Sequence, residues 1–124
     1  MTPNEYQQLA QRTVMDDYNQ AGKIKQALYY NPELSHVVIA ALKLNSESGE
    51  LADSLVKHLC YGQLLDRENI LEECGDLLWY IALILEKLDY NMENCMKDNI
   101  EKLKIRYPEK FTEEHAKLRL DKSE

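Results

Sequence analysis

The scarcity of turn-forming residues most constrains how this chain can fold. Its 124 residues include only four glycines and three prolines. A many-stranded sheet needs frequent tight turns, and Gly and Pro supply most of them. Apolar residues make up 44 % of the chain, which is ordinary for a globular protein. We therefore expect one all-α domain with long helices, small enough for oligomerisation to help its stability.

Charge and cysteine usage argue against several classes of protein. The formal net charge is −7, which repels nucleic-acid backbones and anionic membranes, so neither a nucleic acid polymer nor a membrane is expected as a partner. The three cysteines are odd in number and form no CxxC motif, which indicates reduced thiols in a cytoplasmic protein. No hydrophobic signal region opens the chain, and no run of 18 apolar residues could span a membrane.

Capping residues predict where the helices begin and end. We expect helices over about 3–21, 31–59, 66–88 and 91–107, with residues 23–31 either a continued helix or a connector. The boundary residues are Thr2 and Pro3 at the first start, Gly22 as a stop or bend, Asn31 and Asp66 as caps, and Pro108 after the last helix.

Helical periodicity gives each of the three later helices one apolar stripe. The stripes contain Val37, Ala41, Leu44, Ser48, Leu51, Leu55 and Leu59, then Ile70, Cys74, Leu77, Ile81, Leu85 and Leu88, then Met92, Met96, Ile100 and Leu103. Amphipathic helices with short connections favour an antiparallel bundle of four to five helices. We expect a domain over residues 1–111, with Phe111 packed back on the core. Residues 112–124 are expected to be a charged tail that is either loose or dependent on a partner for its structure.

Two acidic pairs carry the clearest chemical signal. Glu47 and Glu50 lie three residues apart on one expected helix, as do Glu73 and Asp76 on the next, so each pair shares a helix face beside the apolar stripe. Four carboxylates converging at the rim of the core would repel one another unless a cation bound them. Carboxylate oxygens suit Mg²⁺ or Mn²⁺, and no His or Cys joins the set to indicate zinc.

A plainer interpretation of these acids is solvated surface charge. Pairs with this spacing are common on helices, and a single pair would indicate little. Two pairs on neighbouring helices, each enclosing a glycine, favour a site more strongly. A glycine inside a helix costs about 1 kcal/mol relative to alanine, so we expect a close approach to the backbone at Gly49 and Gly75.

Cations suited to phosphate lie on the last expected helix. Asn99, Lys102 and Arg106 share a face, and Tyr107 follows directly. A guanidinium and an ammonium on one edge match phosphate oxygens, and Lys57 on the second helix could reach them too. Lys and Arg on a helix more often only face water, so this set is weak evidence by itself.

Taken together, these segments resemble the MazG-like all-α NTP pyrophosphohydrolases over roughly residues 4–111. That family carries ExxE, a spacer and then ExxD, and the spacer between Glu50 and Glu73 holds 22 residues, within its usual range. The segments that carry the resemblance are Leu44–Asp53, Glu72–Ile81 and Asn99–Pro108 with the following Phe, together with Glu5-Tyr-Gln and Arg12-Thr13 near the start.

The resemblance implies a homodimer or homotetramer with active sites near the subunit contacts. It implies that Glu47, Glu50, Glu73 and Asp76 bind Mg²⁺, for which Mn²⁺ could substitute. It also implies that the nucleotide is held by Asn99, Lys102 and Arg106, with Lys57 and Tyr107 as further candidates. Glu47 and Glu50 are the expected catalytic acids. Many relatives carry an acid or small residue just before the first Glu, but Asn45-Ser46 stands here, so Glu50 and Glu72 are the candidates for a general base.

The implied reaction is hydrolysis of a nucleoside triphosphate between its α- and β-phosphates. Water attacks the α-phosphorus in line, pyrophosphate leaves, and Lys102 and Arg106 stabilise the oxygens. House-cleaning of the nucleotide pool is the role that family habit favours. The competing hypothesis is a non-catalytic helical module that binds a nucleotide or a protein partner.

Overall fold

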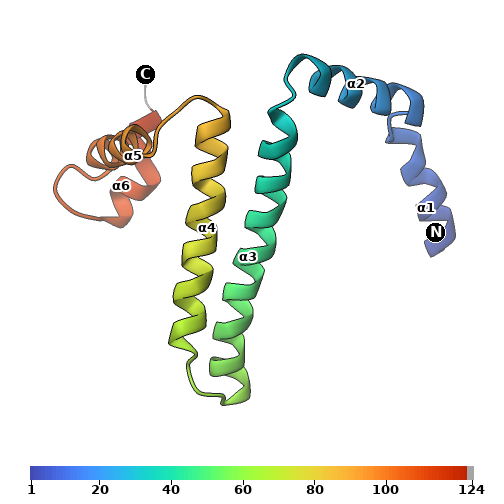
Figure 1. Ribbon diagram of the computed structural model, residues 1–124. Helices are drawn as coiled ribbons and strands as arrows, with labels where there is room; N and C mark the ends of the chain where they lie inside the picture. The colour runs from blue at the N-terminus through green and yellow to red at the C-terminus, as the bar shows by residue number, and fades with distance from the viewer. Residues whose placement is uncertain (123–124) are drawn as a thin grey trace. The chain divides into compact units, whose positions relative to one another are not determined.

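The computed structural model describes residues 1–122 and is helical throughout that range (Figure 1). The all-α prediction is confirmed, although the described chain has six α-helices where four or five were expected. Their bounds are α1 Pro3–Ala10, α2 Asp17–Tyr30, α3 Leu34–Tyr61, α4 Arg67–Lys87, α5 Met92–Arg106 and α6 Glu113–Leu118, with the 3-10 helices η1 Gln11–Thr13 and η2 Leu120–Lys122. The chain divides into two compact units, residues 1–35 and 36–124.

The N-terminal unit contains two helices where one was expected over 3–21. Thr2 and Glu5 form the expected capping box around Pro3. The helix then ends early, and Asp16 starts α2 afresh by accepting hydrogen bonds from the Asn19 backbone N–H (2.9 Å) and side-chain amide (2.6 Å). Gly22 lies inside α2 and does not end it, so the expected stop at this residue was wrong.

The start of α3 also differs from its expected position. Asn31 closes the end of α2, because its backbone N–H donates to the carbonyl of Ala27 at 3.0 Å. A turn over 31–33 follows, in which the Leu34 N–H donates to the Asn31 carbonyl at 3.0 Å. Asn31 is therefore a C-cap of one helix and not the N-cap of the next, and α3 begins two residues later than a helix capped by Asn31 would.

Helices α3 and α4 form a long antiparallel hairpin that positions the acidic residues (Figure 1). Gly62 ends α3 with a φ of +68°, which glycine adopts without the steric cost of a side chain. His58 Nδ1 lies 2.7 Å from the Gln63 carbonyl and ties the turn to the helix. Asp66 caps α4 by accepting the Asn69 N–H at 3.1 Å, as predicted.

The face that α3 turns toward α4 differs in register from the expected stripe. Beyond residue 35, the positions that lose solvent on α3 are Val37, Ala40, Leu44, Glu47, Leu51 and Ser54. On α4 they include Asn69, Ile70, Glu73, Leu77 and Tyr80. Four members of the stripe predicted for α3 are instead exposed, Ala41, Ser48, Leu55 and Leu59, as are two members of the stripe predicted for the next helix, Cys74 and Leu88. We call the covered positions the seam. Glu47 and Glu73 thus lie in the seam itself, not at its rim.

The C-terminal segment is folded, contrary to the expectation of a loose tail. Thr112 caps α6 by accepting the His115 N–H at 3.0 Å, and Arg119 then adopts a left-handed conformation, with φ 51°. Both α6 and η2 contact α5, whose start at the Asn91 cap and end at Arg106 match the prediction. The last two residues of the expected tail, 123–124, lie outside the described residues.

Apolar side chains remain largely uncovered in the single chain. Ala40 is the one buried apolar residue among those the structure describes. Phe111 is 67 % exposed and lies against Tyr107, with ring centroids 5.3 Å apart, so it does not pack back on a core. Within the described range, no helix is long and apolar enough to cross a membrane.

Candidate metal and nucleotide site

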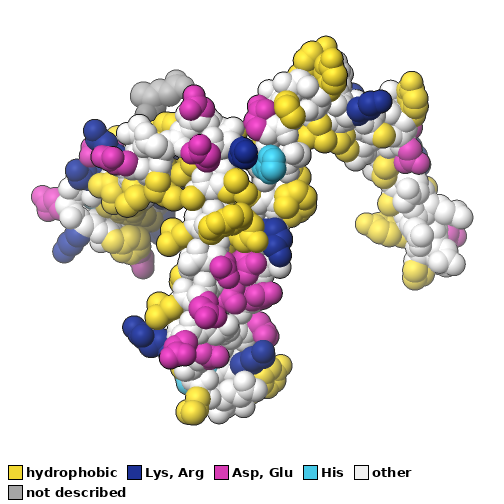
Figure 2. Space-filling model, in the orientation of Figure 1, with side chains coloured by type: hydrophobic (Ala, Val, Ile, Leu, Met, Phe, Trp, Pro, Cys, Tyr) yellow, Lys and Arg dark blue, Asp and Glu magenta, His cyan; other side chains and the backbone are white. Residues whose placement is uncertain are grey.

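Three carboxylates from two helices meet at the hairpin, two of them in the seam and one beside it. One oxygen each of Glu47, Glu73 and Asp76 lies within 4.8 Å of the others. We call these three residues the acid cluster. Glu47 is half-buried, Glu73 is buried with 7 % of its surface exposed, and Asp76 is exposed. Figure 2 shows acidic side chains gathered over the middle of this hairpin. The helical spacing that places Glu73 and Asp76 one turn apart therefore brings both to Glu47.

The electrostatics of Glu73 are unfavourable for a carboxylate. Burial, then a hydrogen bond with Glu47 and then the negative charges of Glu50, Glu47 and Asp76 raise the pKa of Glu73 to about 7. Its Oε2 atom is buried and has no hydrogen-bond partner among the residues described. Buried polar atoms are normally paired, so an orphaned oxygen among like charges calls for a partner from outside the chain.

The donor set of the acid cluster fits a hard divalent cation. All three ligands offer carboxylate oxygens, which Mg²⁺ and Mn²⁺ prefer, and the unpaired Oε2 of Glu73 provides a free donor. A cation there would also cancel the repulsion that raises the Glu73 pKa. The four expected ligands are not equivalent, because Glu50 lies outside the three-oxygen group.

Glu50 instead lines a polar pocket beside the acid cluster. Within the described chain, this pocket is formed by α3 and α4 alone, from the residues Ser46, Gly49, Glu50, Asp53, Ser54, Lys57, Asn69 and Glu73. Lys57 lies on its wall and pairs with Asp53 at 2.9 Å, a contact that raises the pKa of Lys57. The predicted base Glu50 and the predicted phosphate ligand Lys57 thus share one hollow with Glu73.

A hydrogen bond joins the two helices across this pocket. The Asn69 side-chain amide donates to the Ser54 hydroxyl at 2.6 Å, and both residues are partly buried. Each lies one helical turn from an acid, Ser54 from Glu50 and Asn69 from Glu73. Sequence reasoning missed both residues. The signal that could have found them is the 3–4 spacing of the seam, which includes Ser54 when Glu47 is counted as a seam position.

The glycines inside the two acidic pairs are open. A side-chain carbon built on Gly49 or Gly75 would meet nothing within 4 Å. The expected close approach to the backbone therefore does not come from this chain itself. Glu72, the other candidate base, is exposed and does not belong to the acid cluster or to the pocket wall.

The predicted nucleotide ligands of α5 are not brought to the acid cluster within one chain. Asn99 is exposed, and Lys102 and Tyr107 are partly covered. Arg106 lies with its guanidinium 5.9 Å from the Tyr107 ring centroid and forms a salt bridge with Asp121, which the sequence did not suggest. None of these residues lines the pocket formed by α3 and α4 in the described chain.

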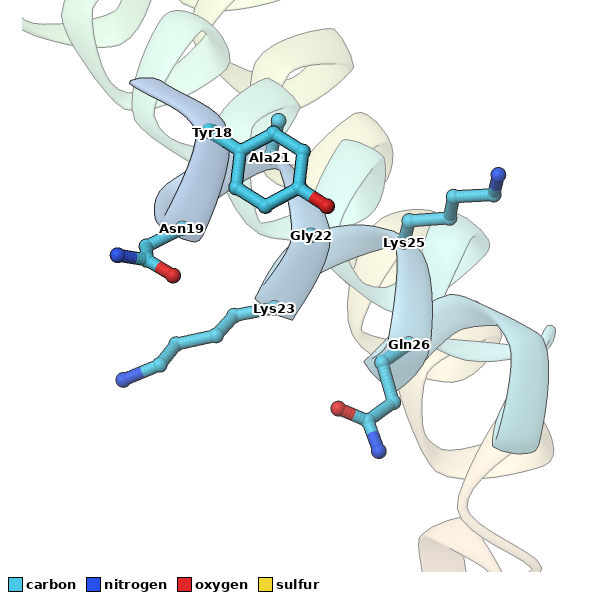
Figure 3. Close-up of a pocket in the computed structure, with 7 residues that line it drawn as sticks. All are labelled: Tyr18, Asn19, Ala21, Gly22, Lys23, Lys25 and Gln26. Atoms are coloured by element: carbon cyan, nitrogen blue, oxygen red, sulfur yellow. The ribbon is translucent and has the colours of Figure 1, made fainter. Parts of the chain in front are cut away.

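A second hollow lies on α2 and has a different character. It is lined by Tyr18, Asn19, Ala21, Gly22, Lys23, Lys25 and Gln26, all from one exposed helix. Figure 3 shows that Lys23 and Lys25 point away from each other, so their charges do not converge on a common ligand. This surface has no arrangement that would hold a nucleotide or a metal ion.

Comparison with known families covers the hairpin and α5. The family model for the MazG nucleotide pyrophosphohydrolase domain matches residues 38–111, which is more than half of the chain. The chain belongs to the MazG nucleotide pyrophosphohydrolase family. The MazG match includes all four predicted metal ligands and the predicted nucleotide ligands up to Tyr107, and it ends before α6 and η2. No curated protein and no solved structure matches this chain significantly.

Proposed function

We propose that this MazG-family protein is a Mg²⁺-dependent nucleoside triphosphate pyrophosphohydrolase, for which Mn²⁺ can replace Mg²⁺. It converts a ribo- or deoxyribonucleoside triphosphate to the monophosphate and pyrophosphate, in a nucleotide-pool house-cleaning role. The observation that carries the proposal is the acid cluster inside the family match, with its buried and unpaired Glu73 oxygen. A nucleotide-binding module without catalysis would not need four acids at these positions.

The acids have distinct tasks in this proposal. Glu47, Glu73 and Asp76, with Glu50 beside them, would hold the cation, which when bound would neutralise phosphate charge and make a water more acidic. Glu50, exposed on the pocket wall, accepts the proton of the attacking water, and Glu72 is the alternative base. The water oxygen bonds to the α-phosphorus, the bond from that phosphorus to the bridging oxygen breaks, and pyrophosphate leaves.

The phosphate ligands come from two places in the proposal. Lys57 stands in the pocket, held by Asp53, and supplies an ammonium close to the acids. Asn99, Lys102, Arg106 and Tyr107 hold the nucleotide from α5. Because these α5 residues do not line the pocket of their own chain, we propose that they act in an assembly of more than one copy.

Self-association as a homodimer or homotetramer is therefore part of the proposal. Large apolar side chains are exposed along the hairpin, and an uncovered patch of this kind usually marks an interface. These include Val38, Ile39, Leu42, Val56, Leu59, Leu71, Leu78 and Trp79. A second copy of the hairpin could cover them. Analytical ultracentrifugation should find an oligomer that Ile39→Asp dissociates, and a wild-type monomer that unfolds cooperatively at every concentration would refute this part.

Pyrophosphate release tests the reaction. A panel of NTPs and dNTPs is incubated with the protein in Mg²⁺, in Mn²⁺ and in EDTA, and both products are quantified. Equal amounts of pyrophosphate and monophosphate, formed only with metal, would support the proposal, and the ranking of substrates would identify the preferred base and sugar. Release of single phosphates, or no turnover by a folded oligomer in either metal, would contradict it and favour the binding-module hypothesis.

A further inference from the structure

The most completely paired charge in the described chain lies outside the family match. Asp121, in η2, accepts two hydrogen bonds from Arg106, from Nε to Oδ1 and from Nη2 to Oδ2, both at 2.7 Å. Arg119 Nε lies 3.5 Å from the same Oδ1. A parallel pair of bonds between a guanidinium and a carboxylate fixes the plane of both groups, which a single contact does not.

This pair is covered as well as geometrically matched. The Asp121 side chain has no exposed surface, and that of Arg106 is 18 % exposed. The Arg106 guanidinium, followed by Arg119, holds the pKa of Asp121 well below its usual range, and the carboxylate in turn raises the pKa of Arg106. Removing one partner of such a covered pair leaves the other without its counter-charge.

Two backbone turns after α6 place Asp121 beside α5. Helix α6 ends in the left-handed residue Arg119, whose backbone N–H donates to the His115 carbonyl at 3.2 Å. The Lys122 N–H then donates to the Arg119 carbonyl at 2.8 Å and closes η2 around Asp121. The segment therefore turns back on α5 and places one carboxylate against the last residue of that helix.

The carboxylate does not use the whole guanidinium. Asp121 engages Nε and Nη2, so the Nη1 amino group is not engaged by it. A guanidinium has five N–H donors in a planar fork, and holding one edge of the fork fixes where the other edge points. A phosphate oxygen could therefore meet Nη1 without displacing Asp121, and it would find the arginine already oriented.

We propose that Asp121 is a positioning residue for the nucleotide site, acting through Arg106. The inference rests on the proposed function, because it takes Arg106 as a phosphate ligand. It makes the segment 112–122, which the family match does not include, part of the functional unit. The opposite role for the same contact is a latch, in which Asp121 occupies the place of a phosphate and must leave before substrate binds.

Kinetics of Asp121→Asn in the full-length chain separate these roles. Asparagine keeps the size of the side chain but removes its charge, so Arg106 loses its fixed orientation. We expect KM for the nucleotide to rise by about tenfold or more, because a small misplacement of a substrate-holding group is costly, while kcat per folded protein changes little. Asp121→Glu, which keeps the charge but displaces the carboxylate by one methylene, should raise KM less. The matched control is Glu101→Gln, which breaks an exposed ion pair with Lys104 on the same helix.

The second part of the test measures the effect of Asp121→Asn in a protein that already carries Arg106→Lys. If Asp121 acts through the guanidinium, Asp121→Asn should add little to the KM of Arg106→Lys. Equal losses in both backgrounds would overturn positioning, because the effect of Asp121 would then not depend on the guanidinium. A rise in kcat/KM of Asp121→Asn would overturn it in favour of the latch, and unchanged kinetics would overturn it outright.

A binding readout keeps this test independent of catalysis. The Arg106 side-chain Nε–H resonance is observed by NMR while Mg²⁺ and inorganic pyrophosphate are added. We expect a sharp Nε–H signal in wild type that exchanges faster in Asp121→Asn, together with at least tenfold weaker pyrophosphate binding by the variant. If wild type hydrolyses no nucleotide, the proposed function fails, yet this pattern would still support positioning. Equal pyrophosphate binding by both proteins would overturn it.

Discussion

Glu73 and Asp121 are both covered carboxylates, but their surroundings differ in sign. Glu73 sits between α3 and α4 among Glu47, Glu50 and Asp76, and these acids and its burial raise its pKa to about 7. Asp121 sits against α5 between Arg106 and Arg119, which lower its pKa. Among the described residues, Glu73 has a buried oxygen with no hydrogen-bond partner, whereas Asp121 accepts two short hydrogen bonds.

The Asp121 carboxylate is thus neutralised by arginines of the same chain, whereas the Glu73 carboxylate is surrounded by other acids. At Asp121 the counter-charge is built in, so the carboxylate can help to hold α6 and η2 on α5. At Glu73 the charges that shift its pKa within the described chain are those of Glu47, Glu50 and Asp76, all negative, and such an arrangement costs stability unless a cation is added. We therefore interpret Asp121 as a residue that stabilises the fold of its own segment, and Glu73 as a residue that binds a cation from outside the chain.

Neutralising Glu73 should produce the largest functional effect. Glu73→Gln keeps the shape of the side chain but removes a charged ligand of the proposed cation. A metal ion contributes several kcal/mol to charge stabilisation in such reactions, and about 1.4 kcal/mol corresponds to tenfold in rate. We expect pyrophosphate release to fall by at least about a hundredfold, with unchanged helicity by circular dichroism and an unchanged or higher thermal midpoint without metal.

Glu86→Gln is the matched control for this variant. Glu86 is exposed, lies on the same helix and does not belong to the acid cluster, so its activity should stay within about twofold of wild type. Near-normal activity of Glu73→Gln would show that the cluster is surface charge and not a metal site.

Breaking the balanced pair should also lower stability, in addition to its proposed effect on nucleotide binding. Asp121→Ala leaves the covered guanidinium of Arg106 without its partner. We expect the thermal midpoint to fall by several degrees, and protease cleavage within 112–122 to become faster, because the segment loses its anchor. Glu101→Gln should change neither. A variant as stable and as protease-resistant as wild type would mean that the pair does not hold the segment.

The two carboxyls should give opposite pH dependences of stability. The folded-state pKa of Glu73 is above its ordinary value of 4.5, so its contribution is present below about pH 4.5 and is lost as pH rises to about pH 7. The folded-state pKa of Asp121 is below its ordinary value of 3.8, so its contribution is present above that value and is lost in acid. Thermal midpoints measured against pH should show both slopes.

Adding Mg²⁺ or substituting one of the two carboxyls should assign each slope of the thermal midpoint against pH to its residue. Saturating Mg²⁺ or the Glu73→Gln substitution should abolish the fall between about pH 4.5 and about pH 7, and Asp121→Asn should remove part of the acid loss. A fall above about pH 4.5 that persists in Glu73→Gln would assign it to other groups.

The bond between Asn69 and Ser54 should give the smallest effect. It joins the two acid-bearing helices at 2.6 Å, but it is a neutral hydrogen bond between partly buried groups. Such a bond contributes about 1 kcal/mol to stability. Urea unfolding of Ser54→Ala should show a loss of that size, whereas Ser48→Ala, which removes an exposed hydroxyl from the same helix, should show less. A double variant with Asn69→Ala that is additive would mean that the two side chains do not interact.

Local signals in the sequence were sufficient to predict where α4 and α5 begin. Asp66 and Asn91 cap their helices because a short polar side chain there meets free backbone N–H groups, and this depends only on neighbours. The same logic misplaced Asn31 and Gly22, because neither residue type determines by itself whether a helix ends. The approach of Glu47 to Glu73 followed from helical spacing and a short connection.

The register of the seam and the fold of the C-terminal segment depend on tertiary contacts, which a sequence pattern does not specify. A step of three or four residues is allowed at each turn of a helix, so apolar periodicity favoured Cys74 for the seam, whereas packing placed Glu73 there. Asp121 lies 15 residues from Arg106, and charge composition alone made its segment look like a solvated tail. The metal and nucleotide assignments stay predictions, since they depend on ligands and partner copies.

Binding of Mn²⁺ is the most direct test of the interpretation of Glu73. Electron paramagnetic resonance of free Mn²⁺ is followed during titration of the full-length wild-type protein, Glu73→Gln and Glu86→Gln. We expect saturable binding by wild type and Glu86→Gln that Mg²⁺ displaces, and at least tenfold weaker binding by Glu73→Gln. Equal affinity in all three proteins, or no binding by the wild type, would show that the open charge between α3 and α4 is not a metal site.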